Sequence, residues 1–126
     1  MSEDLDSNFA RVVRLAEAAG LPGVTVGTSY GTPALLVKDK SFVRMKDGDT
    51  LVVMCAREEK EMLLELDPRL YFETDHYKGW PAMLVRLSEI DDQSLTGRLV
   101  AAWREKAPKR LAATFSERDQ PLSPTS

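Results

Sequence analysis

Four residues suited to recognition or catalysis stand close together in the second half of the chain. The segment 76–80 contains His76, Tyr77, Lys78 and Trp80, which supply an imidazole, two further aromatic rings and a cation. Such a set can stack a planar ligand or line a pocket. Large aromatic residues also commonly cover one end of a hydrophobic core. The sequence leaves both interpretations open, and it leaves open an acid–base role for His76.

The types and spacing of the residues do not indicate nucleophilic or metal-assisted catalysis. One cysteine and one histidine, Cys55 and His76, cannot assemble a Cys/His zinc site, and no carboxylate spacing resembles a calcium loop. The glycines do not follow the strand–glycine–helix pattern of a phosphate cradle. Cys55 stands in an apolar run, so we expect a buried structural residue there. We therefore predict a non-enzymatic protein without catalytic residues, metal or cofactor.

A second group of candidates is cationic. Alternation along the predicted strand 41–46 puts Phe42, Arg44 and Lys46 on one face of a sheet. Cations on a sheet face can contact phosphates, which supply much of the affinity of proteins for nucleic acid. Charges on such a face also serve solubility and protect sheet edges from pairing. The predicted nucleic-acid surface comprises Lys38, Lys40, Arg44, Lys46, Arg86, Lys109 and Arg110.

Bulk composition narrows the class of protein. With 126 residues, 43% of them hydrophobic and 29% charged, the chain fits one globular domain, predicted over 1–115, with a disordered or loosely docked tail over 116–126. A formal net charge of −3 argues against coating nucleic acid through bulk charge. The acidic start lacks a secretory signal, and no apolar run reaches membrane-spanning length. We expect a cytoplasmic protein without membrane contact, a monomer or weak dimer.

The first predicted helix carries apolar residues at i, i+3, i+4 and i+7 spacing. It begins near Phe9, with Ser7 or Asn8 as its N-cap, and it ends at Gly20. Arg11 lies off the apolar stripe, so we expect its side chain to face water.

Two further helices follow the same reasoning. The third helix begins after an N-cap at Asp91 and ends before Pro108, because proline cannot continue a helix. The second helix covers 57–66, and its predicted buried stripe consists of Met62, Leu63 and Leu66.

Strands are predicted from short apolar or alternating runs at 34–38, 41–46, 50–56, 71–74 and 82–87. Turns at Asp39-Lys40 and Asp47-Gly48 join the first three as hairpins, since Asp-Gly tolerates the positive φ angles of a tight turn. Residues 23–33 are interpreted as an irregular loop or short strand. The elements together predict an α+β fold, a two-layer α/β sandwich with an antiparallel five-stranded sheet in the order α-β(3)-α-β(2)-α.

Several separated motifs resemble the MmcQ/YjbR-like family over residues 9–115. They are the stretches 28–34, 40–45, 75–81 and 107–111, which read TSYGTPA, KSFVRM, DHYKGWP and APKRL. The resemblance implies a bacterial protein with a two-layer fold of the secretion-chaperone-like type. It also implies a DNA-binding role by likeness of fold, although the acidic pI and the absence of a second histidine in 76–80 depart from that picture. The residues that match the family pattern, and that form its expected shared surface, are Tyr30, Gly31, Thr32, Pro33, His76 and Trp80.

Three hypotheses of function follow. In the first, the protein is a binding module that contacts DNA through its basic residues. In the alternative, it is a protein-interaction or small-ligand-binding module that uses a cleft near Tyr30, His76 and Trp80. In the third, it is an enzyme, which would require a pocket that encloses His76 beside a nucleophile or a carboxylate.

Overall fold

The computed structural model describes residues 2–119 of the chain. Within this range the chain forms four α-helices, six strands and one short 3-10 helix. No helix among the described residues is long and apolar enough to cross a membrane. In chain order the elements are α1 (Ser2–Ala19), β1 (Val24–Ser29), β2 (Thr32–Val37), β3 (Lys40–Met45), β4 (Thr50–Met54), α2 (Arg57–Leu66), β5 (Tyr71–Phe72), η1 (Asp75–Tyr77), β6 (Ala82–Arg86), α3 (Asp92–Lys106) and α4 (Lys109–Asp119).

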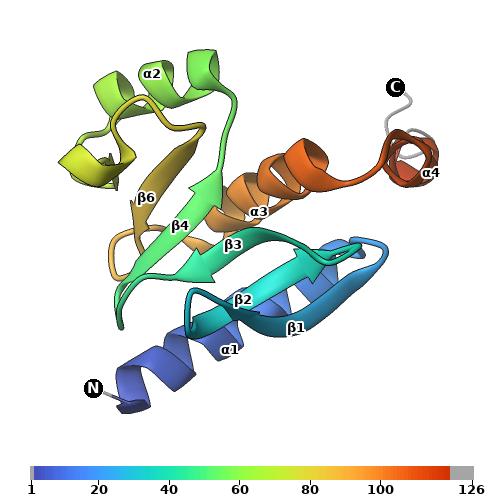
Figure 1. Cartoon of the computed structure of the whole chain (residues 1–126), viewed down its shortest axis with the longest axis horizontal. Helices are drawn as coiled ribbons and strands as arrows, with labels where there is room; N and C mark the ends of the chain where they lie inside the picture. The colour runs from blue at the N-terminus through green and yellow to red at the C-terminus, as the bar shows by residue number, and fades with distance from the viewer. Residues whose placement is uncertain (1, 120–126) are drawn as a thin grey trace.

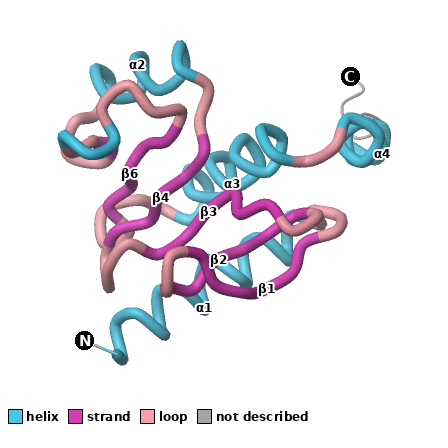
Figure 2. The backbone as a smooth tube through the Cα atoms, in the orientation of Figure 1, coloured by secondary structure: helices cyan, strands magenta, loops and turns pink. Residues whose placement is uncertain are grey.

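The strands form one open antiparallel sheet in the order β1-β2-β3-β4-β6-β5. Helices α1 and α3 lie against one face of this sheet, whereas α2 and α4 lie toward opposite sides of the molecule (Figures 1 and 2). The α+β class with an antiparallel sheet is therefore confirmed. The strand count is corrected from five to six, because residues 23–33, interpreted as an irregular loop or short strand, contain the edge strand β1.

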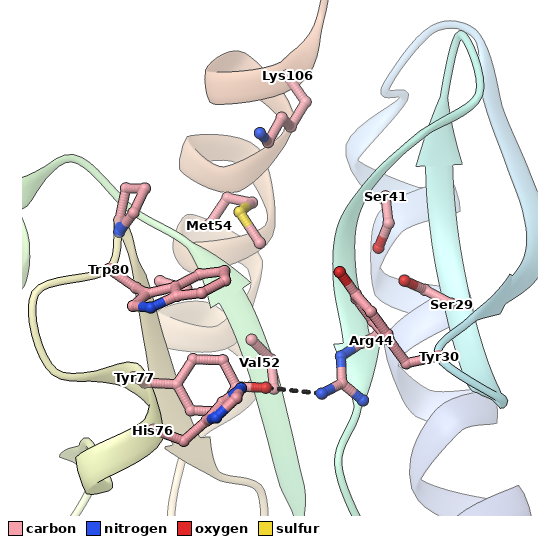
Figure 3. A pocket seen from close by; sticks show the side chains of 12 residues that line it. Ser29, Tyr30, Ser41, Arg44, Val52, Met54, His76, Tyr77, Trp80 and Lys106 are labelled. Carbon is pink, nitrogen blue, oxygen red and sulfur yellow. Dashed lines mark hydrogen bonds between the residues drawn. The ribbon is translucent and has the colours of Figure 1, made fainter.

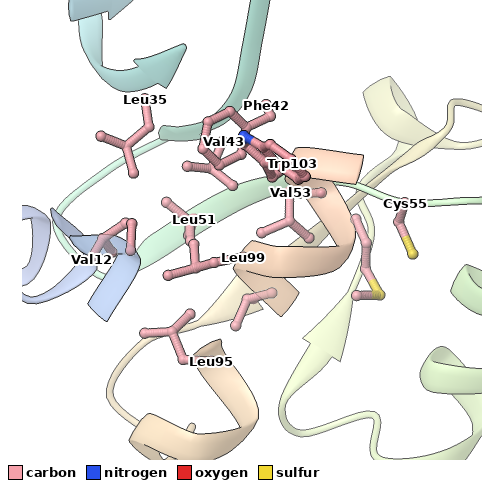
Figure 4. Packing of buried hydrophobic residues seen from close by; sticks show 14 of the residues in the cluster. Val12, Leu35, Phe42, Val43, Leu51, Val53, Cys55, Leu95, Leu99 and Trp103 are labelled. Atoms are coloured by element: carbon pink, nitrogen blue, oxygen red, sulfur yellow. The ribbon is translucent and has the colours of Figure 1, made fainter. Parts of the chain in front are cut away.

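The hydrophobic core fills the space between the sheet and the helices α1 and α3. Alternate strand residues point into it, including Val43, Leu51 and Val53, and they meet Leu99 and Trp103 of α3 (Figure 4). The indole Nε1 of Trp103, whose side chain is fully buried, donates a hydrogen bond to the Pro22 carbonyl over 3.0 Å. A second, smaller hydrophobic cluster lies on the other face of the sheet and consists of Val52, Tyr77, Ala82 and Leu84.

Two tight hairpins organise the first three strands. Tyr30 and Gly31 connect β1 to β2 with φ angles of 53° and 80°, and Lys38 and Asp39 connect β2 to β3 with φ angles of 51° and 68°. Positive φ at both central residues is the requirement of a type I′ turn. The second turn therefore lies one residue before the predicted Asp39-Lys40 position.

The predicted tight turn at Asp47-Gly48 is wrong in its geometry. The connection from β3 to β4 is a longer loop, closed by a 2.8 Å hydrogen bond from Lys46 N to Thr50 O. The Asp47 carboxylate accepts a hydrogen bond from Asp49 N at 2.9 Å, which stabilises the loop without a positive φ at Gly48.

A β-bulge in β3 changes which residues share a face. Leu35 pairs with Val43 and Leu36 with Ser41, so Phe42 is an extra residue in its strand. Phe42 and Val43 are consequently both buried in the core, whereas Arg44 lines the opposite face. The expectation that Phe42 and Arg44 share a face is therefore wrong.

The helices differ from expectation in their ends and faces. Helix α1 begins at Ser2, so Asn8 lies within it, and its side-chain amide donates to the Gly48 carbonyl instead of capping the helix. In α2 the buried residues are Lys60 and Leu63, whereas Met62 and Leu66 are 56% and 73% exposed, so the predicted stripe was wrong for these two. The apolar pattern did not identify the buried face of α2, because one of the buried positions is occupied by a lysine, Lys60.

The C-terminal half of the helical layer is partly as predicted. The Asp91 carboxylate caps α3 by accepting a 2.7 Å hydrogen bond from Ser94 N, and this bond lowers the pKa of Asp91. Helix α4 was not predicted, and its backbone runs into the residues expected to form the tail. The rest of that tail, 120–126, lies outside the described residues.

Candidate ligand-binding pocket

A pocket of about 580 Å³ opens on the face of the sheet opposite the core. Its floor consists of Val52, Met54 and Ala82, which alternate in β4 and β6 with residues of the core. Figure 3 shows Tyr30 on the side of the β1–β2 turn, with His76, Tyr77 and Trp80 facing it from the other side. The complete lining is Ser29, Tyr30, Ser41, Arg44, Val52, Met54, His76, Tyr77, Trp80, Pro81, Ala82 and Lys106.

One side of the pocket is an aromatic wall formed by His76, Tyr77 and Trp80. The rings of His76 and Trp80 stack with centroids 5.8 Å apart and planes at 26°. Tyr77 meets both rings edge-on, with its centroid 5.0 Å from His76 and 6.3 Å from Trp80. Tyr77 is buried, but Trp80 is 51% exposed, so the wall offers aromatic surface to a bound molecule.

The aromatic wall is held from behind by helix α2. The ammonium of Lys60, which is 4% exposed, donates to the carbonyls of Tyr77 and Trp80, each over 2.9 Å. The same ammonium lies 2.8 Å from a carboxylate oxygen of Glu73. Arg57 adds a 3.0 Å hydrogen bond to the carbonyl of Gly79. These contacts fix the backbone that carries the wall.

Tyr30 forms the opposite side of the pocket. Its side chain is 86% exposed, and its backbone has a φ of 53° in the β1–β2 turn. Bulky residues rarely adopt this left-handed conformation, which glycine and asparagine occupy readily. The turn therefore carries an aromatic ring at a position where the backbone alone would favour a smaller residue.

Arg44 lies between the two sides of the pocket. Its Nη2 donates to the hydroxyl of Tyr77 over 2.6 Å (Figure 3). Its Nη1 donates to the hydroxyl of Thr32 over 3.2 Å. The guanidinium carbon is 5.1 Å from the centroid of the Tyr30 ring, within cation–π range. Among the described residues, Arg44 has no carboxylate within ion-pair distance. The pocket thus contains a half-buried cation with no internal counter-charge.

The structure brings together three residues of the predicted shared surface, Tyr30, His76 and Trp80. Thr32 contributes indirectly through its hydrogen bond to Arg44, and Gly31 completes the Tyr30 turn. Pro33 pairs with Thr28 in the sheet and does not line the pocket.

Sequence reasoning missed several lining residues. Lys106, Ser41, Val52 and Met54 were not predicted to belong to a site, whereas Tyr77 had been named among the aromatic residues of the segment 76–80 that could line a pocket. Lys106 lines the pocket from the end of α3, far along the chain from the other lining residues, and no local pattern indicates that approach. The alternation of β4 could have identified Val52 and Met54 as residues of the face opposite Leu51 and Val53.

The cations predicted to contact nucleic acid lie on several separate elements. Lys38 and Lys40 stand at one end of β3, whereas Lys46 stands at the other end. Arg86 donates to the Arg69 carbonyl over 3.0 Å and lies 4.4 Å above the Phe72 ring. Lys109 and Arg110 belong to α4, which lies well away from β6 in Figure 1. Arg44, the remaining member, lines the pocket.

Cys55 lies on the core side of the sheet, away from the pocket. Burial, together with the nearby Glu59 carboxylate, raises the pKa of the Cys55 thiol to about 11. In the part of the chain that the structure describes, no group of three or more His, Cys, Asp or Glu side chains is arranged to hold a metal ion.

Comparison with known proteins supports the resemblance drawn from the motifs. The chain is 41% identical over 69 residues to uncharacterized proteins of Mycobacterium bovis and of two strains of Mycobacterium tuberculosis. The match covers 54% of this chain and 54% of each relative, so the chain spans about half the length of the curated relatives it matches. No solved structure matches the chain. The YjbR family matches residues 19–105, a segment that carries both the aromatic wall and Arg44, and the chain belongs to this family.

Proposed function

We propose that this protein is a small-ligand-binding module whose site is the pocket between Tyr30 and the aromatic wall. Binding is the role that the lining supports, because it combines aromatic and apolar surface with a few polar groups. The imidazole of His76 is stacked on Trp80, and a stacking role accounts for its position.

The observation that carries the proposal is the conformation of Tyr30. An exposed tyrosine with a φ of 53° is disfavoured twice, once by its backbone and once by its apolar surface in water. Strained and exposed residues of this kind are concentrated at functional sites. A ligand that covers the Tyr30 ring accounts for both features.

The shape of the site favours a small molecule over duplex DNA or a protein. Ligand pockets typically measure about 300–1,000 Å³ and combine apolar walls with a few polar groups, as this pocket does at about 580 Å³. A DNA-binding surface would instead present several cations together over a broad face. Here the predicted cations are divided among a turn, β3, the loop that follows β3, β6 and α4, and the net charge is −3.

A thermal-shift screen against a library of small metabolites tests this proposal. We expect at least one compound to raise the unfolding temperature of the unmodified protein, and Tyr30→Asn and Trp80→Ala to reduce that shift strongly. Lys40→Met, which changes an exposed residue of β3 outside the pocket, serves as the control and should respond like the unmodified protein. An empty screen, or equal shifts in all variants, would count against a ligand in this pocket.

A further inference from the structure

We infer that the ligand of this pocket is a flat aromatic molecule that carries an anionic group, either a carboxylate or a phosphate. The inference rests on the proposed function and adds the chemical class of the ligand. It depends on two independent features of the pocket, its uncompensated charge and its facing aromatic surfaces.

The charge of the pocket is the first feature. Arg44 and Lys106 are its only charged lining residues among those the structure describes, apart from the imidazole of His76, and none of the lining residues is acidic. Removing a cation from water without a counter-charge is unfavourable. An anion on the ligand would supply the missing partner through charge-assisted hydrogen bonds, which are the stronger kind.

The guanidinium of Arg44 is already oriented for such an anion. Its bonds to the hydroxyls of Tyr77 and Thr32 hold the plane of the group in place, as does the contact with the Tyr30 ring. A guanidinium has more N–H donors than these partners use, and Nε has no hydrogen-bond partner among the described residues. The free N–H groups can therefore donate to an oxygen of the ligand without a rearrangement of the side chain.

The aromatic surfaces are the second feature. Tyr30 and Trp80, which are among the most exposed large hydrophobic side chains of the described chain, face the pocket from opposite sides (Figure 3). Between them the floor of Val52, Met54 and Ala82 is apolar. A planar ring fits this arrangement because it can stack on aromatic side chains while its edge stays on an apolar surface.

Titration calorimetry with two matched pairs of probes tests the inference. One pair is adenosine 5′-monophosphate and adenosine, and the other is indole-3-acetate and indole-3-acetamide; inorganic phosphate is titrated alone. We expect the anionic member of at least one pair to bind at least about tenfold more tightly than its neutral partner, and inorganic phosphate to bind more weakly than that member. The pair that shows this preference distinguishes a phosphate ligand from a carboxylate ligand.

Variants assign the preference to named residues. Arg44→Met should remove most of the roughly tenfold preference for the anion, whereas Arg44→Lys, which keeps the charge, should retain part of it. Lys40→Met removes a charge from the same strand outside the pocket and should leave the preference unchanged. Trp80→Ala should weaken both members of a pair by about tenfold, since stacking does not depend on the charge. Circular dichroism of each variant establishes that it is folded.

Four results would overturn the inference. Equal binding of the neutral and anionic members would contradict the inference that the ligand carries an anionic group. Binding of inorganic phosphate as tight as that of the aromatic anions would contradict the inference that the ligand contains an aromatic ring. Binding of neither pair, when the metabolite screen finds another compound that requires Tyr30, would overturn the ligand class and leave the proposed function standing. Failure of both the probes and the screen would remove both proposals.

Discussion

Tyr30 illustrates a conflict between local stability and the composition of the pocket. The type I′ turn at Tyr30-Gly31 needs positive φ at both positions, and only Gly31 suits that need. The neighbouring turn at Lys38-Asp39 has the same geometry but does not border the pocket. Because the two turns share their backbone conformation and only the first carries a ring that borders the pocket, comparing them separates the energetic cost of the positive φ from the role of the Tyr30 ring in the pocket.

Tyr30→Asn should stabilise the protein or leave its stability unchanged. Asparagine tolerates the left-handed conformation better than tyrosine, and relief of this strain is worth roughly 1 kcal/mol. Urea unfolding of both proteins measures the difference in the free energy of unfolding. A loss of more than about 1 kcal/mol would mean that the ring stabilises the fold itself, and would remove the argument from strain.

The Cys55 thiol should be inert in the folded protein. Burial first, and then the Glu59 carboxylate, raises its pKa to about 11, so little thiolate is present near neutral pH. Alkylation by iodoacetamide at pH 8, followed by mass spectrometry, should be slow for the native protein and fast in urea. The native rate should increase as the pH rises toward about 11, provided that the fold persists. Equal rates in the two states would contradict this account.

At the scale of elements, polar contacts of Lys60 join helix α2 to the aromatic wall. Lys60 takes a buried position in α2, and its ammonium joins the carbonyls of Tyr77 and Trp80 to the carboxylate of Glu73. The segment that carries the wall contains only a short 3-10 helix, so few backbone hydrogen bonds of its own hold it. The order of this segment consequently depends on Lys60.

Lys60→Met should loosen the wall while the sheet remains folded. The substitution keeps much of the side-chain volume but removes the ammonium from the Trp80 carbonyl, from the partly buried Glu73 carboxylate and from the Tyr77 carbonyl, which keeps its bond from Trp80 N, at a cost of about 3 kcal/mol. We expect faster amide hydrogen exchange over residues 75–81 and weaker ligand binding, with slow exchange retained in β3 and β4. Lys78→Met, on the same segment but exposed, is the control. Unchanged exchange in 75–81 would contradict the anchoring role of Lys60.

The elements also mark the limit of what the sequence predicts. Caps, turn residues and apolar stripes predict α3, most of α1 and the central strands, because these signals are local. The bulge at Phe42 is set by pairing with β2, and the inward position of Lys60 is set by carbonyls of a distant segment. Neither leaves a local signal: the bulge places Phe42 on the core face, contrary to the alternation, and no pattern in the sequence predicts a buried Lys60.

For the candidate site, the sequence predicted the participants better than their roles. Tyr30, His76 and Trp80 were expected to share a cleft, and the structure brings them to one pocket. Arg44 was predicted to belong to a nucleic-acid surface, because alternation along β3 gave no reason to associate it with Tyr77. Lys106 reaches the pocket only through the tertiary packing of α3.

At the scale of the whole molecule, Arg11 connects the first helix to the end of the sheet. This residue was expected to face water, but its side chain is only 19% exposed. Its guanidinium donates to the carbonyls of Leu87 and Ile90 and pairs with Asp92 at 2.8 Å. It thereby ties α1 to the connection between β6 and α3.

Arg11→Met should destabilise the whole fold. Loss of hydrogen bonds from a charged group to two carbonyls costs about 2 kcal/mol, and these carbonyls gain no new donor from methionine. Urea unfolding measures the change in the free energy of unfolding. Arg14→Met, an exposed arginine of the same helix, should change it by less than about 0.5 kcal/mol. Similar values for the two variants would contradict the connecting role of Arg11.

The most direct test of the central claim uses the indole N–H signals of the two tryptophans in a proton–nitrogen correlation spectrum. Trp80 lines the pocket, whereas Trp103 is fully buried in the core on the other face of the sheet, so one signal reports binding and the other serves as an internal control. During titration with the compound that most stabilises the protein, we predict that the Trp80 signal shifts to saturation while the Trp103 signal stays in place. A stationary Trp80 signal at saturating compound would contradict the pocket as the binding site.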